Sequence, residues 1–251
     1  MNDLSELRKV ILDVAYIKQS GHIPSALSIL DLIFAIYQDF ILNENEISNN
    51  KFVLSKGHGS LALYVVLMHF GFISKAELYS FCSEGSALGG HPDSTKLPQI
   101  EASTGSLGHG FPFSLGLALA KKINKQPGKI FVLIGDGELN EGTNWESMLL
   151  GLKLELDNLV LIIDQNSSSS RCLNLDPIAE KFHSFGWLVL EINGHSLSEI
   201  SFALNTNSAK PIVIIARTIK GYGVKEMENN PAWHHTKISK SKYDSLLKDN
   251  F

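Results

Sequence analysis

Five short apolar runs recur along the 251-residue chain, and they constrain its fold more than any other feature. The runs are rich in valine and isoleucine and do not alternate with polar residues, so we expect both faces of each strand to be covered. Because helix signals separate them, they indicate an α/β fold with a doubly wound, mainly parallel sheet and helices on both faces. The predicted strands are residues 52–54, 130–134, 159–163, 187–192 and 212–216.

Helical patterns fill the segments around these strands. Leu4, Leu7, Ile11 and Val14 have three- and four-residue spacing, which predicts an amphipathic helix. Residues 25–41 are apolar nearly all round, as in a helix that is buried on most sides. Capping boxes are predicted at Ser74 with Glu77 and at Ser196 with Glu199. Since no internal repeat or proline-rich linker interrupts the pattern, we expect residues 1–251 to form a single domain.

Composition excludes several classes of partner. Twenty-two basic against 26 acidic residues give a net charge of −4, which indicates neither nucleic acid nor an anionic membrane as partner. Cys82 and Cys172 lie far apart in no CxxC spacing, so neither a zinc site nor a disulfide framework is expected. The first residues lack the pattern of a signal peptide, and no apolar run approaches the roughly 20 residues that a bilayer needs. We therefore expect a soluble, cytoplasmic protein.

Polar side chains follow two of the predicted strands. The run 130–134 leads into Gly135, Asp136, Gly137 and Glu138, and the next run leads into Asn166. In parallel sheets ligands bind beyond the carboxyl ends of the strands, so both groups are expected at one edge. A carboxylate and an amide oxygen suit Mg²⁺ or Ca²⁺, and a metal held this way keeps positive charge for a diphosphate. Taken alone, Gly-Asp-Gly is also ordinary turn chemistry.

The pairing of Asp136 with Asn166, 30 positions later (166 minus 136), resembles the thiamine diphosphate signature. From its first helix to about His235, the chain resembles the amino-terminal, diphosphate-binding half of transketolase. Five blocks in matching order carry this resemblance. They are SGHIPS at 20–25, LSKGHG at 54–59, GHPD at 90–93, TGSLGHG at 104–110 and GDGELNEG at 135–142.

The resemblance implies a set of ligands. For the metal they are Asp136, Asn166 and the backbone carbonyl of Ser168. For thiamine diphosphate they are His58, Gly105, Ser106, Leu107, Gly135, Asp136, Gly137, Glu138 and Asn166. In the family, His58 would lie beside the diphosphate and thiazolium, and Leu107 against the ring system. The serine run 167–170 departs from the family pattern and shortens the following loop, which leaves open how the cofactor ring is covered.

The resemblance also implies substrate contacts. His22, His91 and one of His234 or His235 would line the substrate channel, where imidazole can donate or accept a proton near neutral pH. Glu141 matches a glutamate at the family's subunit interface, in a network that shares protons between active sites. As an acid beginning a helix it would equally be favoured by the helix dipole, and both interpretations stay open. The histidines expected to be structural are His69, His183 and His195.

Parts of a complete transketolase site are missing from this sequence. In the family, a second domain on the neighbouring subunit supplies the glutamate that activates the cofactor's pyrimidine and the arginines that hold the substrate phosphate. This chain reaches Phe251 without that domain and has only three arginines. We therefore expect one subunit of a split transketolase, in an α2β2 heterotetramer with a carboxy-terminal, pyrimidine-binding subunit and sugar phosphate substrates.

The expected reaction transfers a two-carbon ketol unit from a phosphorylated ketose to an aldose. A first alternative is the α subunit of a 2-oxoacid dehydrogenase or another thiamine diphosphate-dependent lyase, which shares the Gly-Asp-Gly and Asn pattern. The blocks around His22, His58 and His91 argue against it, because they resemble the sugar-handling family. A second alternative is a non-catalytic binding or regulatory subunit with an altered serine loop.

Overall fold

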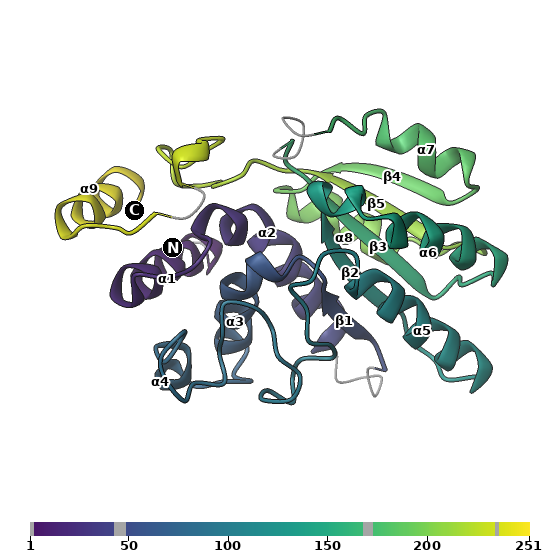
Figure 1. The fold of residues 1–251 in the computed structure, drawn as a ribbon, viewed down its shortest axis with the longest axis horizontal. Helices are drawn as coiled ribbons and strands as arrows, with labels where there is room; N and C mark the ends of the chain where they lie inside the picture. The colour runs from purple at the N-terminus through teal and green to yellow at the C-terminus, as the bar shows by residue number, and fades with distance from the viewer. Residues whose placement is uncertain (1–2, 43–48, 168–172, 234–235) are drawn as a thin grey trace.

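The computed structural model describes residues 3–42, 49–167, 173–233 and 236–251. Its centre is a five-stranded sheet of order β1-β2-β3-β5-β4 in which every neighbouring pair is parallel (Figure 1). The strands are β1 (Lys51–Leu54), β2 (Ile130–Gly135), β3 (Leu159–Gln165), β4 (Leu188–Asn193) and β5 (Ile212–Arg217). The predicted α/β fold with a parallel sheet is confirmed.

Both faces of the sheet are covered, which explains why the strands do not alternate with polar residues. Phe131 and Leu133 of β2 belong to a core cluster on one face, and Val132 and Ile134 belong to a second cluster on the other. Successive side chains of a strand point to opposite faces, so an unbroken apolar run serves both clusters. Every residue of β2 is buried.

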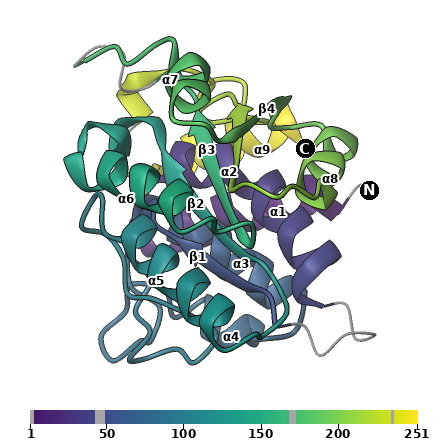
Figure 2. The same cartoon turned by 90° about the vertical axis from the view of Figure 1, so that its right-hand side faces the viewer.

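The helices divide between these two clusters. α1, α2, α3 and α8 contribute to the first cluster, and α5, α6 and α7 contribute to the second. Figure 2 shows α5 and α6 side by side against the sheet. The helices are α1 (Asp3–Lys18), α2 (Ile23–Ile36), α3 (Ser60–His69), α4 (Lys75–Leu78), α5 (Gly110–Ile123), α6 (Gly142–Lys153), α7 (Ile178–Ser184), α8 (Leu197–Asn205) and α9 (Lys240–Asn250).

The predicted helix over residues 25–41 is α2 continued by a π-helical turn, Tyr37–Ile41. Among the described residues, Ile23–Ile41 is the one helix long and apolar enough, by length and composition, to cross a membrane. The expectation that no apolar run approaches this length was therefore wrong. Within the structure, however, 83% of that apolar stretch is buried, as in the core helix of a globular domain.

Capping was predicted correctly at one helix and half correctly at another. At α4 the Glu77 N–H donates to Ser74 Oγ at 3.1 Å and the Ser74 N–H donates to the Glu77 carboxylate at 2.7 Å. At α8, Ser196 Oγ accepts from the Glu199 N–H, but the Glu199 carboxylate accepts from the Asn193 N–H instead. Glu199 thus ties the end of β4 to the helix that follows.

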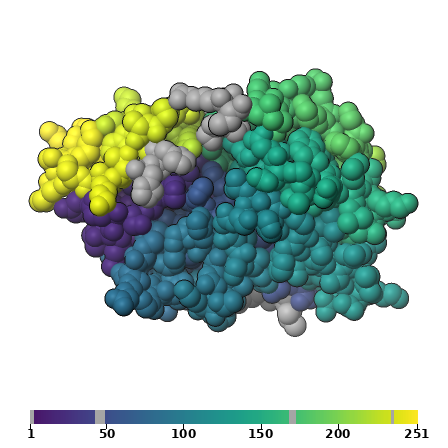
Figure 3. Space-filling view, viewed as in Figure 1, coloured from purple at the N-terminus to yellow at the C-terminus, as the bar shows by residue number. Residues whose placement is uncertain are grey.

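The carboxy-terminal helix α9 packs on the amino-terminal helix α1. The rings of Tyr16 and Tyr243 stack with centroids 4.2 Å apart, and the Tyr243 hydroxyl donates to Asp13 at 2.5 Å. Burial and the neighbouring Asp13 carboxylate raise the pKa of Tyr243. Figure 3 shows the same relationship on the surface, where the yellow carboxy-terminal segment lies against the purple amino-terminal helix.

Candidate functional site at the carboxyl edge of the sheet

The two predicted metal ligands follow neighbouring strands. In the register of β2 and β3, Gly135 pairs with Asp164, so Asp136 and Asn166 both emerge just beyond this pair. Their residues are 5% and 7% exposed. The sheet therefore brings together at one edge two oxygen-bearing side chains that are 30 positions apart in sequence (166 minus 136).

Asp164 organises this edge although its sequence position indicated no role. Its fully buried carboxylate accepts hydrogen bonds from Ser28 Oγ at 2.8 Å, from Thr218 Oγ1 and from Asn166 Nδ2 at 2.9 Å. It also forms an ion pair with the Lys56 ammonium. A buried carboxylate is tolerated when it is paired and hydrogen-bonded to this extent.

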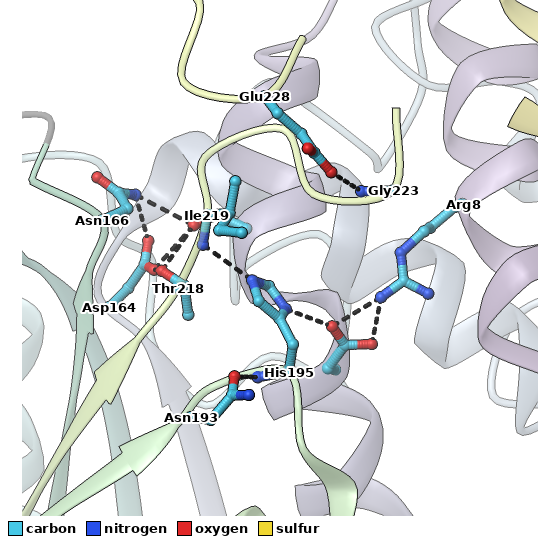
Figure 4. A network of polar contacts seen from close by, with 11 residues as sticks. Arg8, Asp164, Asn166, Asn193, His195, Thr218, Ile219, Gly223 and Glu228 are labelled. Atoms are coloured by element: carbon cyan, nitrogen blue, oxygen red, sulfur yellow. Dashed lines mark hydrogen bonds and ion pairs between the residues drawn. The ribbon is translucent and has the colours of Figure 1, made fainter. Parts of the chain in front are cut away.

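These contacts orient the amide of Asn166. Its nitrogen donates to Asp164 and, at 3.1 Å, to Ser28 Oγ. The amide oxygen consequently points away from Asp164, as Figure 4 shows. On the neighbouring strand end, Asp136 begins a 3₁₀ turn and its Oδ1 accepts from the Gly137 N–H at 2.7 Å.

The donor set at this edge fits a hard divalent cation. One carboxylate and one amide oxygen are ligands that Mg²⁺ and Ca²⁺ accept, and Mg²⁺ usually takes its remaining ligands from substrate phosphates and water. Within the described ranges there is no cluster of three or more His, Cys, Asp or Glu side chains that could hold a metal by itself. Ser168, the third predicted ligand, lies outside the described residues.

Two lysines bring ammonium groups to this edge, beside the carboxylates of Asp136 and Asp164. Lys56 contacts Asp164, and Lys220 lies close enough to Lys56, Asp136 and Asp164 to interact with all three charges. Burial, followed by the positive charge of Lys56, lowers the pKa of Lys220, while the two carboxylates act in the opposite direction. Such ammonium groups suit a diphosphate. Sequence reasoning missed both: Lys56 stood in a matched glycine block without an assigned role, and Lys220 had no motif around it.

The Glu138 carboxylate connects three segments: the residue after β1, the end of β2 and the turn at Gly108. Its carboxylate accepts from Ser55 Oγ, from the Gly108 N–H at 3.1 Å and from the Gly135 N–H at 3.3 Å. The residue is 2% exposed, and burial raises the pKa of its carboxyl, whereas these hydrogen bonds lower it. This carboxylate holds the ends of β1 and β2 against the turn at Gly108. Its contact with the cofactor stays a prediction.

Three predicted histidines lie in a row. The rings of His22 and His58 have centroids 4.2 Å apart, and those of His58 and His91 have centroids 5.3 Å apart. The glycines of the matched blocks make room for His91. A Cβ added at Gly57 would lie 2.8 Å from the His91 ring, and one added at Gly105, where φ is +131°, would lie equally close. His234 and His235 lie outside the described residues.

The turn 105–108 presents two exposed side chains between fixed ends. Ser106 and Leu107 are both exposed, Leu107 by 42%. At one end, Thr104 Oγ1 donates to the Leu54 carbonyl at 2.6 Å. At the other, Thr143 Oγ1 donates to the Gly108 carbonyl at 2.7 Å. A rigid turn with an exposed leucine can cover the ring of a bound cofactor.

Glu141 stands before the first residue of α6 with an exposed side chain, and it forms no side-chain cap with the described residues of that helix. Its contribution to a subunit interface stays a prediction. The histidines expected to be structural occupy other surroundings. The side chain of His195 is 5% exposed beside Asp31, His69 packs on Phe34 and Phe70, and His183 is exposed on α7.

Comparisons with known proteins identify the family that the chain resembles. The family described as "Transketolase, thiamine diphosphate binding domain" matches residues 2–249. A subunit of the apulose-4-phosphate transketolase of Phocaeicola vulgatus is 37% identical over 254 residues, which cover 96% of this chain and 90% of that one. The subunit SqwG of a Clostridium 6-deoxy-6-sulfo-D-fructose transketolase is 32% identical, with 96% and 92% covered.

Complete transketolases share only part of their length with this chain. The human transketolase is 35% identical over 207 residues, which are 80% of this chain and 33% of the human one. The crystal structure of Campylobacter jejuni transketolase superposes with a TM-score of 0.89 at 29% identity, covering all of this chain and 43% of that one. Because the family matches nearly the whole chain and a relative is 37% identical over most of both lengths, this chain belongs to the transketolase family, as a thiamine diphosphate-binding domain.

Proposed function

We propose that this chain is the thiamine diphosphate-binding subunit of a two-subunit transketolase, which transfers a two-carbon ketol unit from a ketose to an aldose. One observation carries the proposal: Asp136 and Asn166 follow the ends of the neighbouring strands β2 and β3, on a sheet edge where Lys56 and Lys220 lie beside the carboxylates. The Phocaeicola and Clostridium relatives are themselves named as transketolase subunits and match over nearly their full length, which supports a separate partner subunit.

The residues of this chain would bind the cofactor through its diphosphate end. Asp136 and Asn166 would hold the metal, Lys56 and Lys220 would neutralise the diphosphate, and Leu107 would cover the ring system. Bound thiamine diphosphate supplies the electron sink that carbon–carbon cleavage requires.

The row of His22, His58 and His91 would bind the sugar's hydroxyl groups and transfer protons to and from it. His22, His58 and His91 come from three separate segments, and their rings lie in successive contact. Neutral imidazole has one donor and one acceptor nitrogen, so a row can bind several hydroxyls and move a proton at the carbonyl oxygen.

The partner subunit would complete the site for an anionic sugar. Among the described arginines, Arg8 is committed to Asp31 and Arg217 pairs with Glu191. The activating glutamate and the arginines for the substrate's anionic group would therefore come from the partner, in an α2β2 assembly. The relatives' names include a phosphate and a sulfo group, which supports a ketose with an anionic end as substrate.

We further propose that the chain acts as one domain in the cytoplasm, without nucleic acid or membrane as partner. The single sheet with a core cluster on each face supports one domain. The exposed free thiol of Cys82 supports the cytoplasmic location, since exposed thiols persist in reducing compartments. Fractionation of cells that express the tagged chain tests the location, with recovery in the membrane fraction as the contrary result.

The test of the function uses the chain co-expressed with its partner subunit. With Mg²⁺ and thiamine diphosphate present, we expect cleavage of a ketose phosphate and ketol transfer to an added aldose. Asp136→Ala should lower this activity about 100-fold or more, because even outer partners of metal ligands change activity about 10- to 100-fold. Asp157→Ala, at an exposed aspartate before β3, should leave it unchanged.

Two outcomes of this assay would contradict the proposal. Consumption of pyruvate in place of a ketose would favour a 2-oxoacid dehydrogenase subunit. Absence of any thiamine-dependent reaction, together with absence of cofactor binding by the complex, would favour a non-catalytic subunit. Neither alternative has a specific observation in its favour, since the matched family and these relatives are transketolases.

A further inference from the structure

A buried chain of polar contacts connects the amino-terminal helix to the segment that follows β5. Arg8 of α1 donates from Nη2 to both carboxylate oxygens of Asp31 in α2, at 2.5 and 2.7 Å. The same carboxylate lies 2.7 Å from Nδ1 of His195, which follows β4 (Figure 4). The side chains of Arg8, Asp31 and His195 are at most 10% exposed. Three charged or titratable groups are thus removed from water in one connected network.

The other ring nitrogen of His195 fixes its tautomer. The Ile219 N–H donates to His195 Nε2 at 2.9 Å, so Nε2 is the acceptor of the ring. The proton of the neutral imidazole then lies on Nδ1 and is donated to Asp31. Both ring nitrogens take part in these hydrogen bonds. The ring therefore links the Asp31 carboxylate to the backbone of Ile219, so a shift of one would move the other.

Residues 218–224, which we call the exit loop, are held by the same groups. The ring of Tyr222 stacks on His195 with centroids 3.6 Å apart, and the Arg8 guanidinium carbon lies 5.0 Å from the Tyr222 centroid. Gly223 has φ +84°, and a Cβ there would lie 2.5 Å from the Arg8 side chain. Arg8 and His195 therefore determine the path of the exit loop through close contact as well as through hydrogen bonds.

The exit loop carries two side chains that reach the cofactor edge. Thr218 Oγ1 donates to Asp164, which in turn orients the Asn166 amide. Lys220 interacts with Asp136 and Asp164. Ile219, whose N–H is held by His195, lies between these two residues. A displacement at Ile219 would move Thr218 and Lys220 together.

We infer that His195, held by Asp31 and Arg8, is a positioning residue for the metal and diphosphate end of the site, which it controls through the backbone of Ile219. The inference rests on the proposed function, because it assigns a role to the network in cofactor binding. The ring of His195 contacts Asp31, Tyr222 and the Ile219 N–H, so its role would be exerted through the exit loop.

The test compares three histidine variants in the complex of this chain with its partner. His195→Phe keeps a ring for Tyr222 to stack on but removes the acceptor for the Ile219 N–H. His195→Gln keeps an amide donor and acceptor, so it should restore part of the effect. His183→Phe is the control, since His183 is exposed on α7 and α7 packs on the opposite face of the sheet.

Two measurements decide the outcome. Hydrogen–deuterium exchange should be faster in the peptide covering the exit loop of His195→Phe and unchanged in peptides from β2 and β3. The Kd for thiamine diphosphate in Mg²⁺, measured by calorimetry, should rise about tenfold or more, since an unpaired buried donor is costly. His195→Gln should fall between His195→Phe and the unchanged protein, and His183→Phe should match the unchanged protein.

The inference is overturned by a Kd within twofold of the unchanged protein, or by exchange that accelerates equally across β2, β3 and the exit loop. The second result would mean a general loss of stability. If His195→Phe does not fold, His195→Gln carries the same comparison with a smaller expected change. Failure of the unchanged complex to bind thiamine diphosphate would contradict the proposed function instead, while the exchange measurement would still test the control of the exit loop by His195.

Discussion

Asn166 donates its amide nitrogen to the buried carboxylate of Asp164 at 2.9 Å, and this bond turns the amide oxygen of Asn166 away from Asp164. The two residues are two positions apart on one strand end, yet they have different roles. Asp164 is fully buried, and its carboxylate is occupied by donors from Ser28, Thr218 and Asn166. The orientation of the Asn166 amide, which we propose to bind the metal, therefore depends on a carboxylate that would not itself bind it.

Asp164→Asn should destabilise the protein strongly. The change removes the charge that pairs with the largely buried Lys56 ammonium, whose side chain is 12% exposed, and breaking a buried ion pair costs about 3–5 kcal/mol. Urea unfolding of the variant measures this loss directly. Asp157→Asn, which changes an exposed aspartate before the same strand, should change the free energy of unfolding by less than about 0.5 kcal/mol. Equal effects of the two changes would contradict the role given to Asp164.

Gly105→Ala should displace His91. The glycine has φ +131°, and the added Cβ would lie 2.8 Å from the His91 ring. We expect a loss of more than about 1 kcal/mol in the free energy of unfolding, together with lower activity. Gly116→Ala is the matched control in α5, where nothing lies within 4 Å of the added Cβ and stability should rise by about 0.5–1 kcal/mol. A neutral Gly105→Ala would contradict the close packing of His91.

Lys220→Met should weaken binding of thiamine diphosphate more than binding of thiamine. The removed ammonium interacts with the carboxylates of the metal edge and would neutralise the diphosphate. We expect the Kd for thiamine diphosphate to rise about tenfold or more in calorimetry. Lys225→Met, an exposed lysine five positions later (225 minus 220), should have no effect. Equal weakening of thiamine and thiamine diphosphate would place Lys220 away from the diphosphate.

Titration of the Glu138 carboxyl should lower the free energy of unfolding as the pH rises. Because burial raises the pKa of its carboxyl, the native state holds this proton more tightly than the unfolded chain does. The free energy of unfolding should then decrease as the pH rises from about 4.5 toward the raised value. Ser55→Ala removes a hydroxyl that donates to the carboxylate and opposes the shift, so the decrease should become larger.

Urea unfolding between about pH 4.5 and 8 checks the Glu138 prediction. Ser114→Ala is the control, because Ser114 is equally buried but donates to the Gly110 carbonyl and not to a carboxylate. It should lower the free energy of unfolding by the same amount at every pH. Parallel pH profiles for the two serine variants would show that Ser55 does not control the titration of Glu138.

The strands and the placement of Asp136 and Asn166 at one sheet edge could be predicted from sequence, because both follow from local rules. Apolar runs without polar alternation indicate a sheet covered on both faces, and parallel strands place their carboxyl ends at one edge. The roles of Thr218 and Lys220 could not be predicted. They reach Asp164 only because β5 lies between β3 and β4, a strand order that no local pattern encodes.

The hydrogen-bond partners of Glu199 and His195 also could not be predicted from the sequence. The Ser196 and Glu199 spacing is that of a capping box, yet Glu199 binds the Asn193 N–H because β4 ends within its reach. His195 was expected to be structural and is buried, but its contacts with Asp31 and Ile219 join residues 164 and 24 positions away (195 minus 31 and 219 minus 195). Such partners depend on packing between elements rather than on spacing within one.

The most direct test of the central claim is a calorimetric titration of thiamine diphosphate into the complex of this chain with its partner subunit. If Asp136 and Asn166 hold the metal that binds the diphosphate, binding should require Mg²⁺, disappear in excess chelator and be lost in Asp136→Ala, while Asp157→Ala binds normally. Binding of equal affinity without a divalent metal, or by Asp136→Ala, would contradict the account.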